Sequence, residues 1–489
     1  MAFNYSKDNL PKKLFINNEF VDAKGTEKLS VYNPNDGSLV ADDVAVADEQ
    51  DVEAAVAAAE KAFPEWRKTT PNQRRDLLQK LASLIEEHAE AMSELTRITL
   101  GDPQSSMGMF QIVISTEVIR YNAGWVDKFA GESFPQEDGF LKIVRNEPFG
   151  VTAGIIPWNI PLPSAVMKLA PAVGTGNVII LKPSEKTPFA ALALGALIKE
   201  AGFPPGVVQV LSGGGSTGAL LAKHMKIRKV SFTGSVITGR KVQEMAIKSN
   251  MKRVTLELGG KSPAVIFDDA NLDNAVKWAA DSMTMNTGQA CVAPSRVYVQ
   301  EGVYDKFLEK YKLAMEEKKK IIGDPTAKGT LVGPLVDQIQ FDRVQGFIER
   351  GKKGEGKLLT GGNRIGDKGY FVEPTIFTDV DPNAEIHTQE IFGPVSVVGK
   401  FKTEEEIIAI ANDTTYGLMA GVFTQDINRA LRVASDFESG MVGINCISNL
   451  PLLTTPFGGY KESGLGRECG IDGLRAFTER KTIMINMTY

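Results

Sequence analysis

Three side chains that are far apart in the sequence have chemistry that suits a covalent reaction at a carbonyl carbon. The first is Cys291, which lies in a glycine-containing turn between a predicted helix and a predicted strand, whereas Cys446 lies inside an apolar run. Because the thiolate is the reactive form of cysteine, a turn position of this kind favours a nucleophile. A structural cysteine is the alternative.

The second side chain is Glu257, at the point where the apolar segment 254–258 gives way to two glycines. A carboxylate buried there is costly unless its pKa rises or the group is used, so Glu257 is a candidate general base. An ion pair with Lys261 or Arg253 is the alternative. The third is Asn159, at another predicted strand end, whose amide has the chemistry to donate to an oxyanion. An ordinary turn residue would also fit that position.

A thiol, a carboxylate and an amide are together what the oxidation of an aldehyde through a thioester requires. The thiolate attacks the carbonyl carbon, hydrogen-bond donors hold the oxyanion, and a hydride leaves to a nicotinamide. A general base then activates the water that hydrolyses the thioester.

Alternating strands and helices are expected to position these residues. We predict strands at 151–156, 177–182, 207–211, 229–233 and 254–258, and a second series at 264–267, 296–300, 395–401, 418–424 and 441–446. Short apolar strands that alternate with helices indicate parallel sheets covered on both faces. The sequence therefore predicts an α/β fold with two parallel-sheet domains.

Two further elements are predicted outside these series. A capping box at Thr70-Pro71-Asn72-Gln73 begins an amphipathic helix, whose apolar stripe is Leu77, Leu81, Leu84, Ile85, Met92 and Leu95. The segment 481–487 is an isolated β-rich stretch, and a lone strand is marginal in water. We expect it to pair with a neighbouring subunit or with the segment 125–145.

Composition and charge narrow the class of protein. The 489 residues include 55 basic and 60 acidic side chains, so neither nucleic acid nor a membrane is an expected partner. Three cysteines and a polar start without a signal peptide favour a reducing, cytoplasmic location. Three histidines form no metal motif, so no metal is expected. The uncharged segment 149–167 is long enough to span a membrane, but its three prolines argue against a spanning helix.

Two glycine-rich segments match known patterns without meeting their other requirements. Residues 213–218 spell both a dinucleotide fingerprint and a hydrolase nucleophile elbow, but no acid ends the next strand. His224 follows Ser216 too closely, with no acid between them. Residues 255–262 end like a phosphate-binding loop but begin with Thr255 in place of glycine. We interpret 213–218 as a plain glycine turn that can line a ligand.

Seven motifs occur in a characteristic order: Pro157-Trp158-Asn159, Lys182-Pro183-Ser184-Glu185, Phe232-Thr233-Gly234-Ser235, Leu256-Glu257-Leu258-Gly259-Gly260-Lys261-Ser262-Pro263, Gly288-Gln289-Ala290-Cys291, Glu390-Ile391-Phe392-Gly393-Pro394 and Pro456-Phe457-Gly458-Gly459-Tyr460-Lys461-Glu462-Ser463-Gly464. With these motifs the chain resembles the NAD(P)-dependent aldehyde dehydrogenase superfamily over essentially its whole length. The resemblance implies two doubly wound parallel-sheet domains plus a small β oligomerisation element. It places a dinucleotide-binding domain at 1–125 and 149–258, a catalytic domain at 259–465 and the oligomerisation element at 126–148 and 475–489.

The resemblance also implies an activity, the oxidation of an aldehyde to the carboxylic acid with NAD. Cys291 is then the nucleophile and Glu257 the base for thioester hydrolysis. Asn159 and the backbone N–H of Cys291 form the oxyanion hole. Lys168 and Glu468 match positions tied to proton movement or to the architecture of the site. A homodimer or homotetramer is implied as well.

The implied cofactor is a nicotinamide dinucleotide. Lys182 and Glu185 are expected at the adenosine ribose, and Ser235 at the pyrophosphate, where a helix N-terminus favours an anion. Glu390 and Phe392 are expected at the nicotinamide ribose and ring. The other implied contacts are Ile156, Pro157, Trp158, Gly215, Gly234, Gly239, Leu258 and Gln340. Because a carboxylate accepts from a ribose 2′-OH and repels a 2′-phosphate, Glu185 favours NAD, although Lys182 leaves some NADP use open.

By the same resemblance, the aldehyde pocket is lined by a mostly apolar set of residues: Ile160, Pro163, Ser164, Met167, the loop 448–453 and Phe457. A carboxylate-bearing semialdehyde would need a cationic partner there, so an apolar or aromatic aldehyde is expected. Two alternatives stay open. One is a CoA-acylating semialdehyde dehydrogenase, against which the presence of Glu257 argues. The other is a non-catalytic binding or structural relative, which would not need Cys291, Glu257 and Asn159 together.

Overall fold

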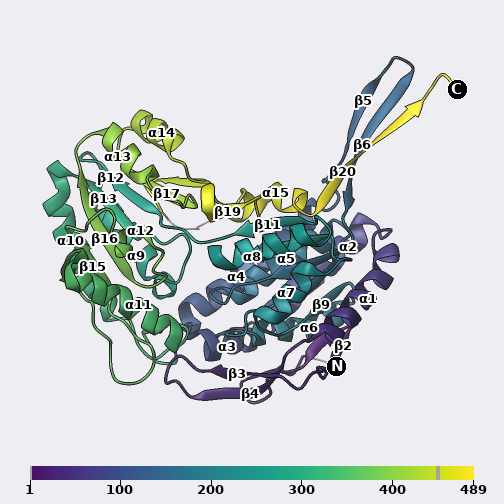
Figure 1. Ribbon diagram of the computed structural model, residues 1–489, viewed down its shortest axis with the longest axis horizontal. Helices are drawn as coiled ribbons and strands as arrows, with labels where there is room; N and C mark the ends of the chain where they lie inside the picture. Colours follow the sequence, from purple (N-terminus) through teal and green to yellow (C-terminus); the bar gives the residue numbers. More distant parts are fainter. Residues whose placement is uncertain (1–2, 448–451) are drawn as a thin grey trace.

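The computed structural model describes residues 3–447 and 452–489 and confirms the α/β fold. Two large sheets with their helices form the two sides of the molecule, and a narrow three-stranded sheet projects from it (Figure 1). The N-terminus lies on the side of the first sheet, and the C-terminus lies at the projecting sheet.

The first sheet has eight strands in the order β19-β11-β10-β7-β8-β9-β1-β2. Its parallel strands are the predicted ones: β7 (Val151–Ile155), β8 (Val178–Lys182), β9 (Val208–Val210), β10 (Lys229–Thr233) and β11 (Arg253–Glu257). Antiparallel strands that the sequence did not predict complete it: β1 (Leu14–Ile16), β2 (Glu19–Val21) and β19 (Gly464–Leu465). Because the chain order reverses between β7 and β10, the carboxyl ends of these strands border a crevice of the kind that binds ligands.

Every residue of β7 and β8 is buried, as expected for a parallel sheet covered on both faces. The helices of this part are α1 (Glu49–Trp66), α2 (Pro71–Glu87), α3 (Ala89–Leu100), α4 (Met109–Trp125), α5 (Pro161–Gly174), α6 (Phe189–Ala201), α7 (Gly215–Lys223) and α8 (Val236–Lys248). A separate two-stranded sheet consists of β3 (Lys28–Tyr32) and β4 (Leu39–Ala45).

The predicted capping box at the start of α2 is present, since Thr70 and Gln73 exchange side-chain and backbone hydrogen bonds. The prediction of one continuous helical stripe as far as Leu95 is wrong. The helix ends at His88, whose backbone is no longer helical, and α3 begins at the next residue. The His88 ring stacks on Phe3 with 4.4 Å between the ring centroids, which makes it a packing residue at the helix boundary.

The second sheet has seven strands in the order β14-β15-β16-β13-β12-β17-β18. Its parallel strands are β12 (Pro263–Ile266), β13 (Arg296–Gln300), β15 (Thr375–Thr378), β16 (Val395–Phe401), β17 (Met419–Phe423) and β18 (Met441–Ile444). The antiparallel edge strand β14 (Lys357–Thr360) and its neighbour β15 were not predicted. The helices are α9 (Leu272–Thr284), α10 (Tyr304–Lys319), α11 (Gln338–Arg350), α12 (Glu385–Thr388), α13 (Glu404–Asn412) and α14 (Ile427–Asp436).

The two sheets meet at opposite strand ends. Glu257 ends β11 in the first sheet, and Pro263 begins β12 in the second. Since β12, β13 and β16 are adjacent and parallel, the segments that lead into them come together at the amino edge of the second sheet. This amino edge therefore faces the carboxyl edge of the first sheet. The short helices of the chain are η1 (Gln104–Gly108), η2 (Met285–Gly288), η3 (Glu301–Val303), η4 (Gly351–Glu355), η5 (Leu452–Thr454) and η6 (Lys461–Ser463).

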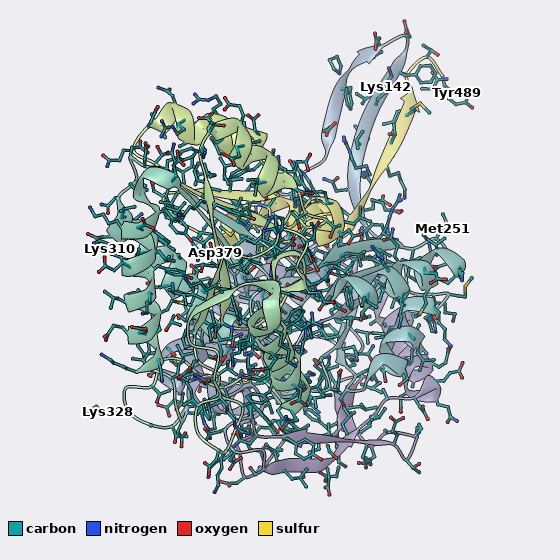
Figure 2. The ribbon with its side chains drawn as sticks, turned by 60° about the vertical axis from the view of Figure 1, so that its left-hand side comes forward. Lys142, Met251, Lys310, Lys328, Asp379 and Tyr489 are labelled. Carbon is teal, nitrogen blue, oxygen red and sulfur yellow. The ribbon has the colours of Figure 1, made fainter. Side chains whose placement is uncertain are left out.

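The projecting sheet contains β5 (Glu132–Glu137), β6 (Phe140–Pro148) and β20 (Thr478–Asn486), and the short α15 (Gly470–Arg475) leads into it. β20 pairs antiparallel with β6 along its whole length. The predicted C-terminal strand thus pairs with the earlier segment of the same chain. Figure 2 shows Lys142 and Tyr489 on this projection, away from the rest of the molecule.

Within the described ranges, no helix combines the length and the apolar character needed to cross a membrane. The uncharged segment 149–167 instead forms β7, a loop and the first half of α5.

Candidate active site

One cavity between the two large sheets is lined by all three of the residues singled out from the sequence, Cys291, Glu257 and Asn159. Its empty volume is about 930 Å³, with the open mouth included. Asn159 follows β7 and Glu257 ends β11, both at the carboxyl edge of the first sheet. Cys291 precedes β13 at the amino edge of the second sheet. The meeting of the two edges therefore brings the thiol, the carboxylate and the amide together.

The turn that leads to Cys291 has an unusual backbone. Asn286, Thr287 and Gly288 are three successive residues with positive φ, at 50°, 57° and 71°. The left-handed conformation is unfavourable for residues with a side chain and persists only where the surroundings hold it. Thr287 Oγ1 donates to the carbonyl oxygen of Gly333 at 2.7 Å. A methyl group at Gly288 would lie 2.3 Å from the carbonyl carbon of Gly393, so a glycine is required there.

Gln289 is the residue that holds this turn, and the sequence analysis did not single it out. It is fully buried, and its Nε2 donates to the carbonyl oxygen of Asn286 at 3.0 Å and to that of Pro334 at 3.4 Å. Its Oε1 accepts from the backbone N–H of Val336 at 2.9 Å. The signal available in the sequence was an amide side chain two residues before a candidate nucleophile. Gln289 thus fixes the path of the backbone into Cys291.

Asn159 is attached to the same turn. Its side-chain Nδ2 donates to the backbone carbonyl oxygen of Gln289 at 3.0 Å. The backbone carbonyl oxygen of Asn159 accepts from Asn286 Nδ2 at 2.9 Å. The first bond uses one of the two N–H groups of the amide. Among the residues that the structure describes, the second N–H has no acceptor, which leaves it for a ligand in the cavity.

Glu257 is 2% exposed, and in the described part of the chain neither of its carboxylate oxygens has a hydrogen-bond partner. Burial, and next the carboxylate of Glu468, raise the pKa of Glu257 well above its usual value, although nearby cations oppose the shift. The alternative prediction, an ion pair between Glu257 and Lys261 or Arg253, is wrong for both partners. Lys261 Nζ donates to the carbonyl oxygen of Ile386 at 2.9 Å, and Arg253 lies 3.6 Å from Glu479.

The Cys291 thiol is protonated at neutral pH in this structure. Burial, and next the carboxylates of Glu390 and Glu257, raise its pKa to about 12. A thiolate must therefore be generated during the reaction, because the resting site does not supply one.

A buried ion pair lies behind Glu257. Lys168 Nζ contacts Glu468 Oε1, and it also donates to Thr233 Oγ1 at 2.8 Å and to Ser231 Oγ at 3.2 Å. Ser231 Oγ in turn donates to Glu468 Oε1 at 2.9 Å. Because Thr233 and Glu468 line the cavity, this cluster joins the floor of the cavity to strand β10.

The implied adenosine and pyrophosphate contacts lie at the carboxyl edge of the first sheet. Lys182 ends β8, and its Nζ lies 3.6 Å from Glu185 Oε2; burial lowers the pKa of this lysine. Ser235 is the N-cap of α8 and accepts from the backbone N–H of Thr238 at 3.3 Å. Gly215 begins α7, and no atom would obstruct a side chain there, so the surface beside it is open. The remaining positions of this edge follow β7, β10 or β11: Ile156, Pro157, Trp158, Gly234, Gly239 and Leu258.

The implied nicotinamide contacts lie at the amino edge of the second sheet. Glu390 Oε1 accepts from the backbone N–H of Gly260 at 3.0 Å, and burial raises the pKa of Glu390 to about 7. Phe392 has a φ of 61°, and its ring meets that of Trp158 edge-on at 5.2 Å. Gln340 Nε2 donates to the carbonyl oxygen of Phe392 at 2.8 Å. In this structure Gln340 therefore holds the Phe392 loop.

The expected aldehyde pocket coincides with the apolar part of the cavity. Its lining includes the predicted Ile160, Pro163, Ser164, Met167, Leu453 and Phe457. The sequence analysis missed Met107, Phe110 and Ile114, which α4 and η1 contribute from a part of the chain without a recognised motif. Residues 448–451 of the predicted loop lie outside the described residues. No arginine lines the described part of the cavity.

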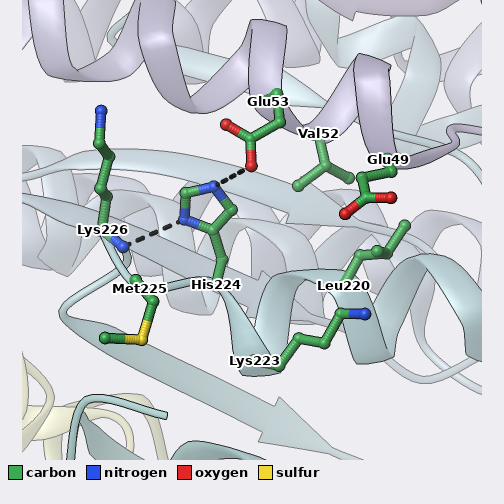
Figure 3. A pocket seen from close by; sticks show the side chains of 8 residues that line it. All are labelled: Glu49, Val52, Glu53, Leu220, Lys223, His224, Met225 and Lys226. Carbon is green, nitrogen blue, oxygen red and sulfur yellow. Dashed lines mark hydrogen bonds and ion pairs between the residues drawn. The ribbon is translucent and has the colours of Figure 1, made fainter.

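A second hollow, between α1 and α7, explains why the nucleophile-elbow pattern at 213–218 is misleading (Figure 3). His224 Nε2 lies 3.0 Å from Glu53 Oε1, and its Nδ1 accepts from the backbone N–H of Lys226 at 3.1 Å. Ser216 is exposed at the opposite end of α7. The only histidine near this serine in the sequence is therefore engaged elsewhere, and the pattern has no catalytic base.

Comparisons with known proteins agree with this arrangement. The pattern of the aldehyde dehydrogenase family matches residues 20–483. The chain is 47% identical to an aldehyde dehydrogenase of Agaricus bisporus, over 97% of this chain and 95% of that one, and 44% identical to cytosolic aldehyde dehydrogenase 1 of Mus musculus, over 97% and 95%. The NAD+ complex of an aldehyde dehydrogenase from Bacillus cereus superposes with a TM-score of 0.94 at 42% identity, over 97% of this chain and 96% of that chain. An indole-3-acetaldehyde dehydrogenase of P. syringae, solved with NAD+ and IAA, superposes with a TM-score of 0.95 at 37% identity, over 99% and 100%. With a match that spans both sheets and the cavity between them, the chain belongs to the aldehyde dehydrogenase family.

Proposed function

We propose that the protein oxidises an aldehyde to its carboxylic acid with NAD, through a thioester on Cys291. The observation that carries the proposal is the single cavity that holds the Cys291 thiol, the Asn159 amide and the unpaired carboxylate of Glu257. Family membership and related enzymes solved with NAD support aldehyde oxidation with this cofactor. In the described part of the cavity, the lining is mostly apolar and contains no arginine, which favours an apolar or aromatic aldehyde.

In the first half of the reaction, the Cys291 thiol first releases its proton to solvent in the open cavity. The resulting thiolate then attacks the carbonyl carbon, and the carbonyl oxygen becomes an oxyanion. The free N–H of Asn159 and the backbone N–H of Cys291 stabilise this charge. Because the Asn159 amide donates a hydrogen bond to Gln289 in the Cys291 turn, the positions of these two donors are fixed relative to each other. NAD, when bound, accepts the hydride that leaves the same carbon, and the product on the sulfur is a thioester.

In the second half, a water molecule attacks the thioester carbonyl and Cys291 leaves as the thiolate. Glu257 takes the proton of this water, since neither carboxylate oxygen is occupied by another partner. Because burial raises the pKa of Glu257, hydrolysis is expected to become faster as the pH rises and the carboxylate ionises. The adjacent Lys168–Glu468 pair is a route by which the proton leaves.

The residues at the two sheet edges fit a nicotinamide dinucleotide. Ser235 and the N-terminus of α8 suit the pyrophosphate, because helix-end N–H groups and the dipole favour an anion. Lys182 and Glu185 suit the adenosine ribose, and the exposed carboxylate of Glu185 favours NAD over NADP. Glu390 and Phe392 suit the nicotinamide ribose and ring. Gln340 would act on that ribose directly or through Phe392.

This placement supports a division of the chain by role. We assign 1–125 and 149–258 to dinucleotide binding, 259–465 to catalysis, and 126–148 with 475–489 to oligomerisation. The short strand β19 crosses the second boundary, since it pairs with β11 of the first sheet. A cytoplasmic location fits three cysteines that all lack a disulfide, and one relative is named as cytosolic.

The first test measures NADH formation by the purified protein with NAD and a panel of apolar and aromatic aldehydes, with and without CoA. We expect NADH without CoA, and its loss in Cys291→Ala because no thioester forms. Cys446→Ala is the matched control, since this cysteine does not line the cavity, and it should keep the wild-type rate. NADH only in the presence of CoA would favour the acylating alternative. Wild-type silence under all conditions would favour a binding protein.

The second test isolates the role of Glu257. We expect Glu257→Gln to form about one NADH per site in a rapid burst and then to turn over at least about a hundredfold more slowly than wild type, because the acyl-enzyme accumulates without a base. Glu244→Gln, on the exposed face of α8, is the control and should behave as wild type. A full steady-state rate in Glu257→Gln would remove this residue from the mechanism.

The projecting sheet suits an interface with a second copy of the chain. Both of its outer strands, β5 and β20, have an edge without a partner in the described chain. Its exposed apolar side chains are Phe134, Phe140, Met484, Ile485 and Met487. Unpaired edges and exposed apolar side chains are features that pairing with another chain removes. We propose a homodimer or homotetramer in which this sheet crosses to another subunit.

Sedimentation of a variant that lacks residues 481–489 tests this interface. The deletion removes most of β20, so we expect a smaller assembly than that of the full-length chain, with the cavity and its thiol retained. Lys310→Ala, on the exposed side of α10, serves as the control and should keep the wild-type mass. An unchanged mass in the deletion variant would contradict the proposed role of the sheet.

A further inference from the structure

A buried oxygen atom near the aldehyde pocket has no hydrogen-bond partner. Asn122 lies in α4 and is 5% exposed. Its Nδ2 donates to the carbonyl oxygen of Val118 at 2.8 Å, whereas its Oδ1 has no partner anywhere in residues 3–447 and 452–489. Because a carbonyl oxygen only accepts hydrogen bonds, this contact fixes which end of the amide is nitrogen. Oδ1 is therefore a buried acceptor that its own helix leaves unused.

A narrow void lies against Asn122, and its empty volume of about 230 Å³ includes the open solvent at its mouth. Val118 and Pro171 line it together with Asn122, while Met167, Leu453 and Cys469 line both this void and the main cavity. Those three side chains form the partition between the two spaces. The void is too narrow to admit a water molecule, so no solvent satisfies Asn122 Oδ1 there.

A ligand can displace part of this partition, because one of its side chains is flexible. Met167 is unbranched and has a flexible thioether side chain, which adapts readily to a neighbouring group. Cys469 is small and leaves room beside it. If Met167 turns aside, the void becomes an extension of the aldehyde pocket, with Asn122 as the polar side chain in a lining that is otherwise mostly apolar.

We propose that the aldehyde carries a neutral hydrogen-bond donor, a hydroxyl group or a ring N–H, at the end remote from its carbonyl, and that Asn122 Oδ1 accepts from it. This inference rests on the proposed function and names the substrate class of the same site. Oδ1 accepts hydrogen bonds but offers no donor, so it selects against a distal ether or carboxylate. A neutral donor fits better than an ammonium group, because the surrounding Val118, Pro171 and Met167 supply no charge to pair with it. A site whose buried acceptor is left unpaired by the wrong substrate discriminates more strongly than apolar contact alone.

Matched aldehydes test this proposal. We would measure kcat/KM with NAD for cinnamaldehyde and its 4-hydroxy and 4-methoxy derivatives, and for the shorter phenylacetaldehyde series with the same substituents. Hydroxyl and methoxy groups have similar electronic effects on the ring, but only the hydroxyl donates. In at least one series we expect the hydroxy aldehyde to exceed the methoxy aldehyde and the parent by about tenfold or more. Equal values within both series would overturn the inference.

Two variants separate the hydrogen bond from the shape of the pocket. In Asn122→Leu, which has a similar branching pattern and no acceptor, the hydroxy-to-methoxy ratio should fall to about one-tenth of the wild-type ratio or less. Met167→Leu reshapes the partition but keeps the acceptor, so it should change all values together and preserve the ratio. The same ratio in Asn122→Leu as in wild type would contradict the proposal.

Thermal unfolding gives a readout that does not depend on activity. Because Oδ1 has no partner in the described structure, Asn122→Leu should unfold at the wild-type temperature or above it. A marked decrease would show that the oxygen has a structural partner and would overturn the proposal. Failure of every aldehyde to yield NADH would refute the proposed function itself, whereas oxidation without any hydroxyl preference would refute this inference alone.

Discussion

A carboxylate without a hydrogen bond, held in the same cavity as a thiol, is the constraint on which the rest of this site depends. Glu257 is placed there by the end of a parallel strand, and no donor in the described part of the chain reaches either of its oxygens. A methyl group at Gly458 would lie only 2.7 Å from Glu257 Oε1. An unpaired buried carboxylate opposes folding, so it persists only where the remaining structure is stable enough to hold it. In the proposed reaction, this same lack of partners keeps both oxygens available for a water molecule.

The fold brings this carboxylate next to a nucleophile from another part of the chain, Cys291. Each large sheet contributes one strand edge, and the cavity forms where the carboxyl edge of the first meets the amino edge of the second. Gln289 then converts this approximate meeting into fixed geometry, because its side chain holds the Cys291 turn and its carbonyl oxygen holds Asn159. This turn requires Asn286 and Thr287 to adopt the left-handed backbone conformation, which is unfavourable for residues with a side chain.

The sequence predicted most of the parallel strands to within two residues, because strands buried on both faces are continuous apolar runs. It did not predict β1 or the edge strands β2 and β14, because β1 is an apolar run of only three residues and the two edge strands are short and only partly buried. It also missed the break at His88, where the apolar stripe continues although the helix does not. Only the structure could exclude an ion pair between Lys261 and Glu257, because Lys261 instead donates to a backbone carbonyl oxygen that is far away in the sequence. No pattern in the sequence marks Asn122, because only the structure shows that its buried Oδ1 has no hydrogen-bond partner among the described residues.

The state of Glu257 is the most direct measure of this account. Because burial raises its pKa well above the usual value, the carboxyl group loses its proton at a higher pH than an exposed glutamate does. Infrared difference spectra between wild type and Glu257→Gln, recorded over a series of pH values, should therefore show the C=O stretch of a protonated carboxyl group at pH values where an exposed glutamate is already ionised, and this band should disappear as the pH rises further. A band that disappears over the same pH range as the band of an exposed glutamate would contradict the central claim.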